Sequence, residues 1–138
     1  MYEKILVAID GSEPSEHALQ AVKELALLSH GEVLVFHLVE RDVYIKVGMV
    51  EEETPLEAQK LVSEAVKSLT SAGVKAEGSV KPCLVGHVAK EILEEAEKRN
   101  ISLIALGSRG RGELTALLLG STAHKVIHLA TTPVLVVR

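Results

Sequence analysis

The sequence is poor in aromatic residues and in cysteine. Of its 138 residues only Tyr2, Phe36 and Tyr44 are aromatic, and none is tryptophan. The core must therefore be aliphatic, and the chain lacks the aromatic platforms on which single-stranded nucleic acids stack. The one cysteine, Cys83, cannot form a disulfide within the chain or build a thiolate metal site.

The chain also lacks an excess of positive charge and any long apolar run. Fifteen basic residues stand against 19 acidic ones, a net charge of −4, whereas nucleic-acid-binding proteins usually carry a basic excess. The longest apolar runs, such as 33–36 and 116–119, fall far short of the roughly 20 residues of a membrane span. Residues 1–4 lead directly into the first strand-like run without the apolar stretch of a signal peptide, so we expect no secretory leader. We expect a cytoplasmic protein with no nucleic-acid or membrane partner.

What is present indicates one globular domain over residues 1–138. Apolar residues make up 47% of the chain and charged residues 25%, which excludes intrinsic disorder. Strand-type patterns alternate along the chain with helix-type patterns. Because parallel strands joined by helices need right-handed crossovers, this alternation predicts a single doubly wound, three-layer α/β/α domain with a parallel sheet. The expected strands are 4–9, 33–39, 74–82, 101–106 and 134–137; the expected helices start near residues 12, 54, 87 and 121.

Two helix starts are explicit in the sequence. Ser12 followed by Pro14 is typical of a capped first turn. Thr54, Pro55 and Glu57 match a capping box. The segment 41–53 between the second strand and this box has no clean period and is predicted to be a long loop.

A glycine-rich segment indicates phosphate binding. Gly107-Ser108-Arg109-Gly110-Arg111-Gly112 directly follows a predicted strand, and Gly120-Ser121-Thr122 opens a predicted helix. Glycine lets backbone N–H groups approach an anion, and a helix N-terminus adds free N–H donors and partial positive charge. Two common phosphate loops do not fit. Glu and Leu follow Gly112 where a P-loop needs Lys and Ser or Thr, and residue 115 is Thr where the dinucleotide fingerprint needs Gly.

The spacing Gly107-x2-Gly110-x9-Gly120-Ser121 resembles the ATP-binding branch of the universal stress protein family. Residues 4–12 resemble the opening strand and turn of that family, and residues 132–137 its closing strand. The resemblance implies a Rossmann-like five-stranded parallel sheet in the order 3-2-1-4-5. It also implies ATP as the ligand, with or without Mg²⁺, and a homodimer formed through Val134–Val137.

The resemblance further implies a set of binding residues. Asp10 would face the adenosine end of the nucleotide, and the backbone of Leu38 would contact adenine. Two departures from the family pattern are Ser102, where an acidic residue is common, and Thr122, where a small aliphatic residue is common. The residues implied to bind the nucleotide are Ala8 and Ile9 beside the base, Asp10, Leu38, then Leu106, Gly107, Arg109 and Gly110 along the nucleotide, and Gly120, Ser121 and Thr122 at the phosphates.

Other interpretations stay open from the sequence alone. Asp10 is also a common helix-cap or turn residue, and Arg109 and Arg111 are also typical of solvated loop charges. His124 and His128 are four apart on a predicted helix, but no third ligand accompanies them. A regulatory ATP-binding module acting through nucleotide-dependent conformation or association is the main hypothesis. A slow ATPase, or a dimerisation module with an empty cleft, is the alternative, and no catalytic or metal-ligating residues are assigned.

Overall fold

The computed structural model describes residues 1–41, 53–110 and 119–138. Strands and helices alternate along the chain, as the pattern predicted. In order they are β1 (Lys4–Ala8), α1 (Glu13–Ser29), β2 (Glu32–Arg41), α2 (Pro55–Ser71), β3 (Ala76–Leu84), α3 (Val88–Lys98), β4 (Leu103–Gly107), α4 (Ser121–Leu129) and β5 (Val134–Val137). Most of the predicted loop 41–53, together with Arg111 and Gly112, lies outside the described residues.

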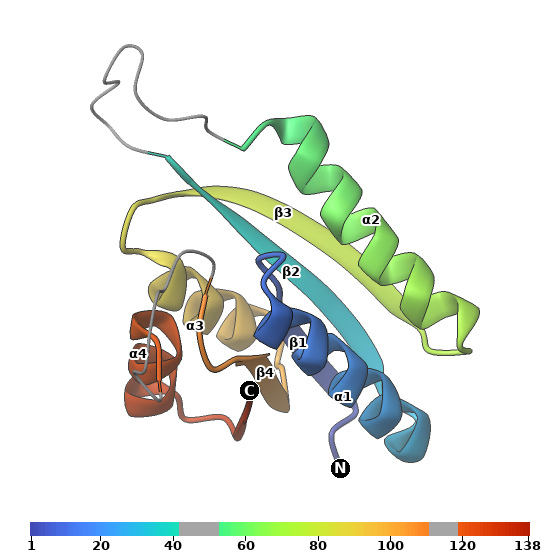
Figure 1. The fold of residues 1–138 in the computed structure, drawn as a ribbon. Helices are drawn as coiled ribbons and strands as arrows, with labels where there is room; N and C mark the ends of the chain where they lie inside the picture. Colours follow the sequence, from blue (N-terminus) through green and yellow to red (C-terminus); the bar gives the residue numbers. More distant parts are fainter. Residues whose placement is uncertain (42–52, 111–118) are drawn as a thin grey trace.

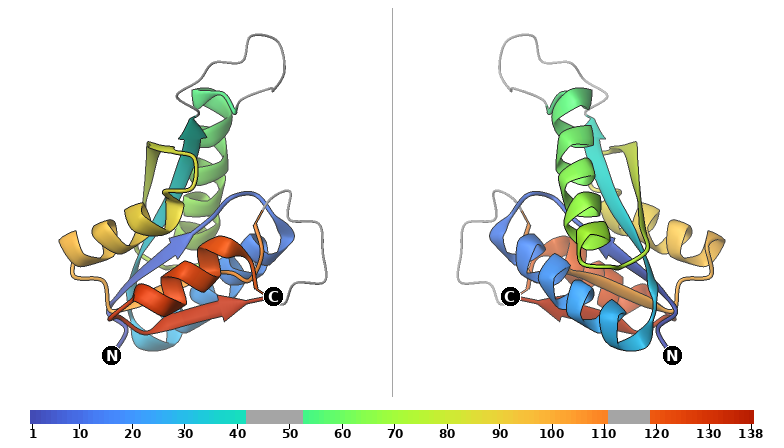
Figure 2. Two further views of the ribbon diagram at one scale, coloured as in Figure 1. Left: turned by 90° about the vertical axis from the view of Figure 1, so that its left-hand side faces the viewer. Right: turned by 90° about the vertical axis from the view of Figure 1, so that its right-hand side faces the viewer.

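The five strands form one parallel sheet in the order β3-β2-β1-β4-β5. Helices α1 and α2 cover one face, and α3 and α4 cover the other (Figures 1 and 2). The predicted three-layer, doubly wound architecture and its strand order are therefore confirmed. None of the described helices is long and apolar enough to cross a bilayer.

Alternation along the central strands builds two aliphatic cores. Ile5, Val7 and Val35 point to the α1–α2 side, where Val22 and Leu69 pack against them. On the α3–α4 side, Ile92 of α3 and Val126 of α4 are buried together with the strand residues Leu6, Leu34, Phe36 and Ile104. Because β1, β2 and β4 are covered on both faces, they read as nearly continuous apolar runs.

Both predicted helix caps are formed. Ser12 Oγ accepts from the Ser15 N–H at 3.3 Å. Thr54 Oγ1 accepts from the Glu57 N–H at 3.1 Å, and the Glu57 carboxylate accepts from the Thr54 N–H at 3.4 Å, which completes the capping box. These bonds satisfy N–H groups that the first turn of a helix leaves without partners.

Three details correct or explain the sequence predictions. The third strand is β3, Ala76–Leu84, rather than 74–82. Pro82 is tolerated within it because β3 is an edge strand. Lys75 O accepts a hydrogen bond from β2, so the backbone groups of odd-numbered residues in this segment face β2. The backbone nitrogen of Pro82, an even-numbered residue, therefore faces away from the sheet. Ile127 of α4, although apolar, is 47% exposed. Ser102, the departure ahead of β4, accepts from Lys4 N at 3.1 Å and donates to Lys4 O at 2.9 Å, joining β4 to β1.

Candidate functional site

A cleft of about 330 Å³ lies at the carboxyl ends of β1, β2 and β4. In this strand order the winding reverses between β1 and β4, and ligands of open α/β sheets bind at that point. All the residues implied by the resemblance line this one cleft: Ala8, Ile9, Asp10, Leu38, Leu106, Gly107, Arg109, Gly110, Gly120, Ser121 and Thr122. The structure therefore brings together segments that are more than 100 residues apart in the chain.

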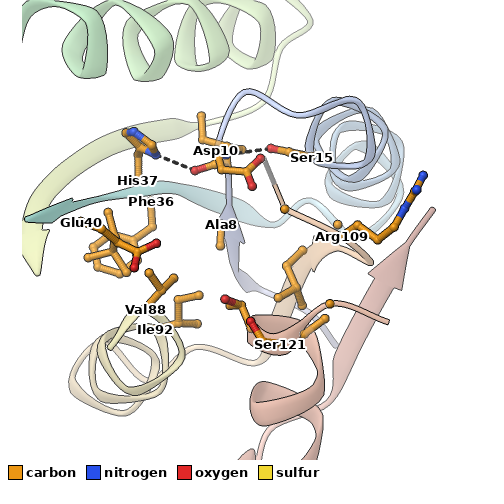
Figure 3. Close-up of a pocket in the computed structure, with 18 of the residues that line it drawn as sticks. Ala8, Asp10, Ser15, Phe36, His37, Glu40, Val88, Ile92, Arg109 and Ser121 are labelled. Atoms are coloured by element: carbon orange, nitrogen blue, oxygen red, sulfur yellow. Dashed lines mark hydrogen bonds between the residues drawn. The ribbon is translucent and has the colours of Figure 1, made fainter. Parts of the chain in front are cut away.

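The turn from β1 into α1 forms one side of the cleft. The Asp10 carboxylate accepts from the Ser12 N–H at 2.9 Å and from the Ser12 hydroxyl. The Asp10 N–H donates to the buried Ser15 hydroxyl at 3.0 Å, and Gly11 between them has φ +83°, which favours glycine. Asp10 thus holds the turn, as the alternative interpretation expected, while it also lines the cleft (Figure 3).

The end of β2 supplies backbone polar groups. Pairing between β1 and β2 stops at Ala8 and Phe36, followed by one bond from Ile9 N–H to Phe36 O at 2.9 Å. Because the even-numbered residues of β2 point their backbone groups toward β1, those of Leu38 lie just past the end of this ladder and face the cleft. An N–H and a C=O on one residue match the acceptor and donor on the edge of a purine.

An apolar wall lies below these groups. Ala8, Phe36, Val88 and Ile92 line it, the last two from the first turns of α3 (Figure 3). Phe36 and Ile92 are almost fully buried. A flat ring of the size of a nucleobase can rest on such a surface, with its polar edge toward Leu38.

The opposite side of the cleft is the start of α4. Its N-cap, Gly120, has no side chain to cap the helix, and the first helical bond is His124 N–H to Gly120 O at 2.9 Å. The N–H groups of Ser121, Thr122 and Ala123 therefore lack partners within the helix, and these residues line the cleft. The cap residues of α1 and α2, Ser12 and Thr54, have side chains that satisfy such groups.

Two glycines of the motif act differently from the sequence interpretation. Gly120 has φ −74°, which any residue adopts, and its N–H donates to Ser108 O at 2.6 Å rather than facing the cleft. Ser108 in turn donates from its N–H to Val137 O at 2.7 Å, so it fastens the start of α4 to β4 and β5. A Cβ on Gly107 would lie 2.8 Å from the Pro14 carbonyl carbon and the Ser15 nitrogen. Gly107 is thus required for packing against α1.

Arg109 is the one arginine of the motif that the described residues include. It lines the cleft, but its side chain is exposed and extends away from Ser121 and Phe36 (Figure 3). Its carbonyl oxygen accepts weakly from the Ser12 hydroxyl at 3.5 Å, which links the residues after β4 to the β1–α1 turn.

Sequence analysis missed a polar group at the back of the cleft. His37 is 4% exposed, its Nδ1 lies 2.7 Å from Ile9 O, and its Nε2 lies 2.9 and 3.0 Å from the two carboxylate oxygens of Glu53. Arg41 donates to the backbone oxygen of Glu53 at 2.9 Å. The sequence does contain a signal for this group, because His37 is the single polar residue in the apolar run 33–39. A histidine in such a run is buried and needs hydrogen-bond partners.

Cys83 lies in β3, partly buried against the core on the α3–α4 side of the sheet. Burial raises the pKa of its thiol, and the negative charges of Glu40 and Glu91 raise it further. A thiol with a raised pKa is a poor nucleophile at neutral pH. This agrees with a structural rather than a reactive cysteine.

The fold and the cleft define a class: α/β proteins of the Rossmann-like type, with a ligand site beyond the carboxyl ends of the strands. The family model described as "Universal stress protein family" matches residues 1–138. The universal stress protein YxiE of Bacillus subtilis is 36% identical over 151 residues, covering 100% of both chains. The universal stress protein MJ0577 of Methanocaldococcus jannaschii is 32% identical, covering 100% of this chain and 96% of that one. The chain belongs to the universal stress protein family.

Solved structures agree with this assignment. A structure of MJ0577 superposes with a TM-score of 0.82 at 30% identity, covering 99% of this chain and 96% of the other. A universal stress protein from Archaeoglobus fulgidus, solved in complex with dAMP, superposes with a TM-score of 0.75 at 25% identity and covers 99% and 98% of the two chains. Nucleotide binding thus occurs in a structural relative of this chain.

Proposed function

We propose that this protein binds ATP in the cleft between β1, β2 and α4 and acts in the stress response through nucleotide-dependent conformation or association. The observation that carries the proposal is the uncapped N-terminus of α4, whose first-turn N–H groups line the cleft. Such a terminus attracts phosphate through its donors and its dipole. Support also comes from the dAMP complex of the Archaeoglobus fulgidus relative.

The remaining lining fits the rest of the nucleotide. The base would rest on the wall formed by Ala8, Phe36 and Ile92, with its polar edge at the backbone of Leu38. Asp10 lies beside the path to the phosphates and would face the ribose. The volume of about 330 Å³ falls in the range of small-ligand sites. A metal ion would be bound chiefly by the phosphates, since no three His, Cys, Asp or Glu side chains cluster among the described residues.

A pair of variants at the first residue of α4 tests the proposal. Ser121→Pro removes one backbone N–H at a position where proline suits a helix, and Gly120 before it already has the extended backbone that a following proline requires. Ser121→Ala removes only the hydroxyl and is the matched control. We expect Ser121→Pro to weaken ATP binding about tenfold or more relative to Ser121→Ala, the size of one charge-assisted hydrogen bond.

Calorimetric titration with Mg-ATP gives the affinities, and phosphate release from the same samples distinguishes a binding protein from a slow ATPase. The wild-type Kd should lie in the micromolar range, and a saturating excess of ATP should raise Tm. Equal affinities for Ser121→Pro and Ser121→Ala would remove α4 from the phosphate site.

We further propose that two copies associate through β5. This strand ends the sheet, and its residues Val134–Val137 are half-buried and uncharged. Because Pro133 O and Val137 O accept from β4, the backbone groups of Val134 and Val136 point to the free edge. Ile127 and Leu129 of α4 add exposed apolar side chains, 47% and 61% exposed. Natural sheets seldom leave such an edge uncovered.

A proline on the free edge tests the association. Val136→Pro removes an outward N–H and leaves the bonds to β4 in place, which is the one setting in which proline fits a strand. Val136→Thr keeps both the N–H and the branched shape. Light scattering should give a dimer mass for the wild type and for Val136→Thr, and a monomer mass for Val136→Pro. A monomeric wild type, with and without ATP, would refute the association.

A further inference from the structure

The buried histidine at the back of the cleft, His37, has more hydrogen-bond acceptors around it than a neutral imidazole can serve. Nδ1 faces the Ile9 carbonyl at 2.7 Å, and a carbonyl oxygen can only accept, so Nδ1 carries a proton. Nε2 faces both oxygens of the Glu53 carboxylate at 2.9 and 3.0 Å. A neutral ring protonated on Nδ1 would point a lone pair at that carboxylate. The geometry is satisfied only when the pair holds one further proton.

With that proton, His37 donates through both ring nitrogens, to Ile9 O and to the Glu53 carboxylate. The Arg41 side chain holds the backbone of Glu53 by donating to its carbonyl oxygen at 2.9 Å. His37 thus connects Glu53, which precedes the N-cap of α2, to Ile9 at the end of β1.

The contact with Ile9 has a direct consequence for the cleft. The Ile9 carbonyl lies past the end of the β1–β2 ladder, and His37 supplies the hydrogen bond that the next strand residue would otherwise make. Leu38 is thereby left with its backbone facing the cleft rather than bonded to Ile9. The same bond fixes the peptide that leads into Asp10.

We propose that His37, held by Glu53, is a positioning residue of the nucleotide site that keeps Leu38 and Asp10 in their binding geometry. This inference rests on the proposed ATP site. Loss of the donor at Nδ1 leaves the Ile9 carbonyl without its partner, whereas a change confined to the Glu53 carboxylate leaves that bond in place.

Three variants test the positioning role. His37→Asn keeps a donor for Ile9 but loses the contact with Glu53. Glu53→Gln places an amide that can donate to a neutral Nε2, so the hydrogen bond no longer needs the extra proton. His37→Ala removes both contacts and leaves a buried carbonyl unsatisfied. His30→Asn is the matched control, because His30 is an exposed residue in the left-handed conformation that asparagine tolerates, at the far end of α1.

The experiment is titration with ATP at one pH near neutrality, with each affinity divided by that of the wild type. His30→Asn should give a ratio near one. His37→Ala should bind ATP about tenfold more weakly than His37→Asn, because only asparagine keeps a donor for the Ile9 carbonyl. Glu53→Gln, which keeps a partner for Nε2, should stay close to the wild type. Equal ATP affinities for His37→Ala and His37→Asn would overturn the inference.

A second measurement needs neither ATP nor a variant. In the nitrogen spectrum of the histidine rings of the wild-type protein, Nδ1 of His37 should carry a proton, because it faces the Ile9 carbonyl. An unprotonated Nδ1 would also overturn the inference. If the wild type binds no ATP, the proposed function fails while this spectrum still tests the contact with Ile9. If ATP binds, and His37→Ala and His37→Asn bind it alike, only the inference fails.

Discussion

Replacing Glu95 with glutamine should destabilise the fold although the two side chains have the same shape. Glu95 of α3 is only 3% exposed and accepts from Lys81 Nζ at 2.8 Å and from Arg99 Nε at 2.7 Å. The contact with Lys81 holds α3, and with it the apolar wall of the cleft, onto β3, and the contact with Arg99 lies at the end of α3 itself. A glutamine keeps one acceptor oxygen but turns an NH2 group toward the second cation.

The magnitude follows from these contacts. One hydrogen bond between charged groups is lost, worth about 1.5–3 kcal/mol. Lys81 and Arg99 are 38% and 36% exposed and regain some hydration, and Arg99 keeps its contact with Glu77. The cost should therefore stay below the ~3–5 kcal/mol of breaking a fully buried pair. We expect about 2 kcal/mol, or a fall in Tm of about 6–10 °C for a domain of this length.

The pH dependence provides a second check on the same variant. Burial alone would raise the pKa of Glu95, but hydrogen bonds from Lys81 and Arg99 and their charges outweigh it and lower the pKa. Stability from a carboxylate with a lowered folded-state pKa is complete above the unfolded value of about 4.3 and is lost as the pH falls through the folded value. The gap in Tm between wild type and Glu95→Gln should be full at about pH 7 and shrink in acid.

The assay is thermal unfolding followed by circular dichroism across this pH range. Glu94→Gln is the matched control, because Glu94 is 60% exposed and its contact with Lys90 spans 3.9 Å; such a surface pair contributes little. The reasoning is refuted if Glu94→Gln costs as much as Glu95→Gln, or if the Glu95→Gln gap does not change with pH.

Three further predictions concern the cleft and its walls. Gly107→Ala should lower the stability of the nucleotide-free protein by about 1–3 kcal/mol, because the added Cβ meets backbone atoms of Pro14 and Ser15 that cannot turn aside; a variant that melts like wild type but binds ATP poorly would return Gly107 to a purely ligand-facing role. Asp10→Ala should weaken ATP binding and also lower Tm, since it removes the acceptor for the Ser12 N–H; loss of stability with unchanged affinity would leave Asp10 as a turn residue only. Thr54→Ala should cost about 1 kcal/mol in chemical denaturation through loss of the capping box, with ATP affinity unchanged.

Most of the architecture could be predicted from the sequence because local signals and global pattern agree. Ser12, and Thr54 with Glu57, mark helix starts through hydrogen bonds that involve only a few neighbouring residues. Continuous apolar runs identify strands that are covered on both faces. The strand boundaries were less accurate, since β3 extends to Leu84 through Pro82. Whether proline fits there depends on which side of the strand faces the sheet edge, and that is a property of the sheet and not of the segment.

The lining of the cleft could be predicted as a set, but not the contacts within it. Gly107 and Gly120 were assigned to phosphate approach, whereas Gly107 makes room for α1 and Gly120 donates to Ser108. Both contacts join residues that are distant in sequence or separated by a loop, so no local pattern encodes them. His37 and Glu53 lie 16 residues apart, and their pairing depends on where α2 begins relative to β2.

A crystal structure of the protein grown with Mg-ATP tests the central claim most directly. The phosphates should lie at the first turn of α4, within hydrogen-bond distance of the N–H groups of Ser121, Thr122 or Ala123. The adenine should contact the backbone of Leu38 and rest against Phe36 and Ile92. ATP bound elsewhere on the molecule, or a cleft that stays free of nucleotide at saturating concentration, would contradict the account.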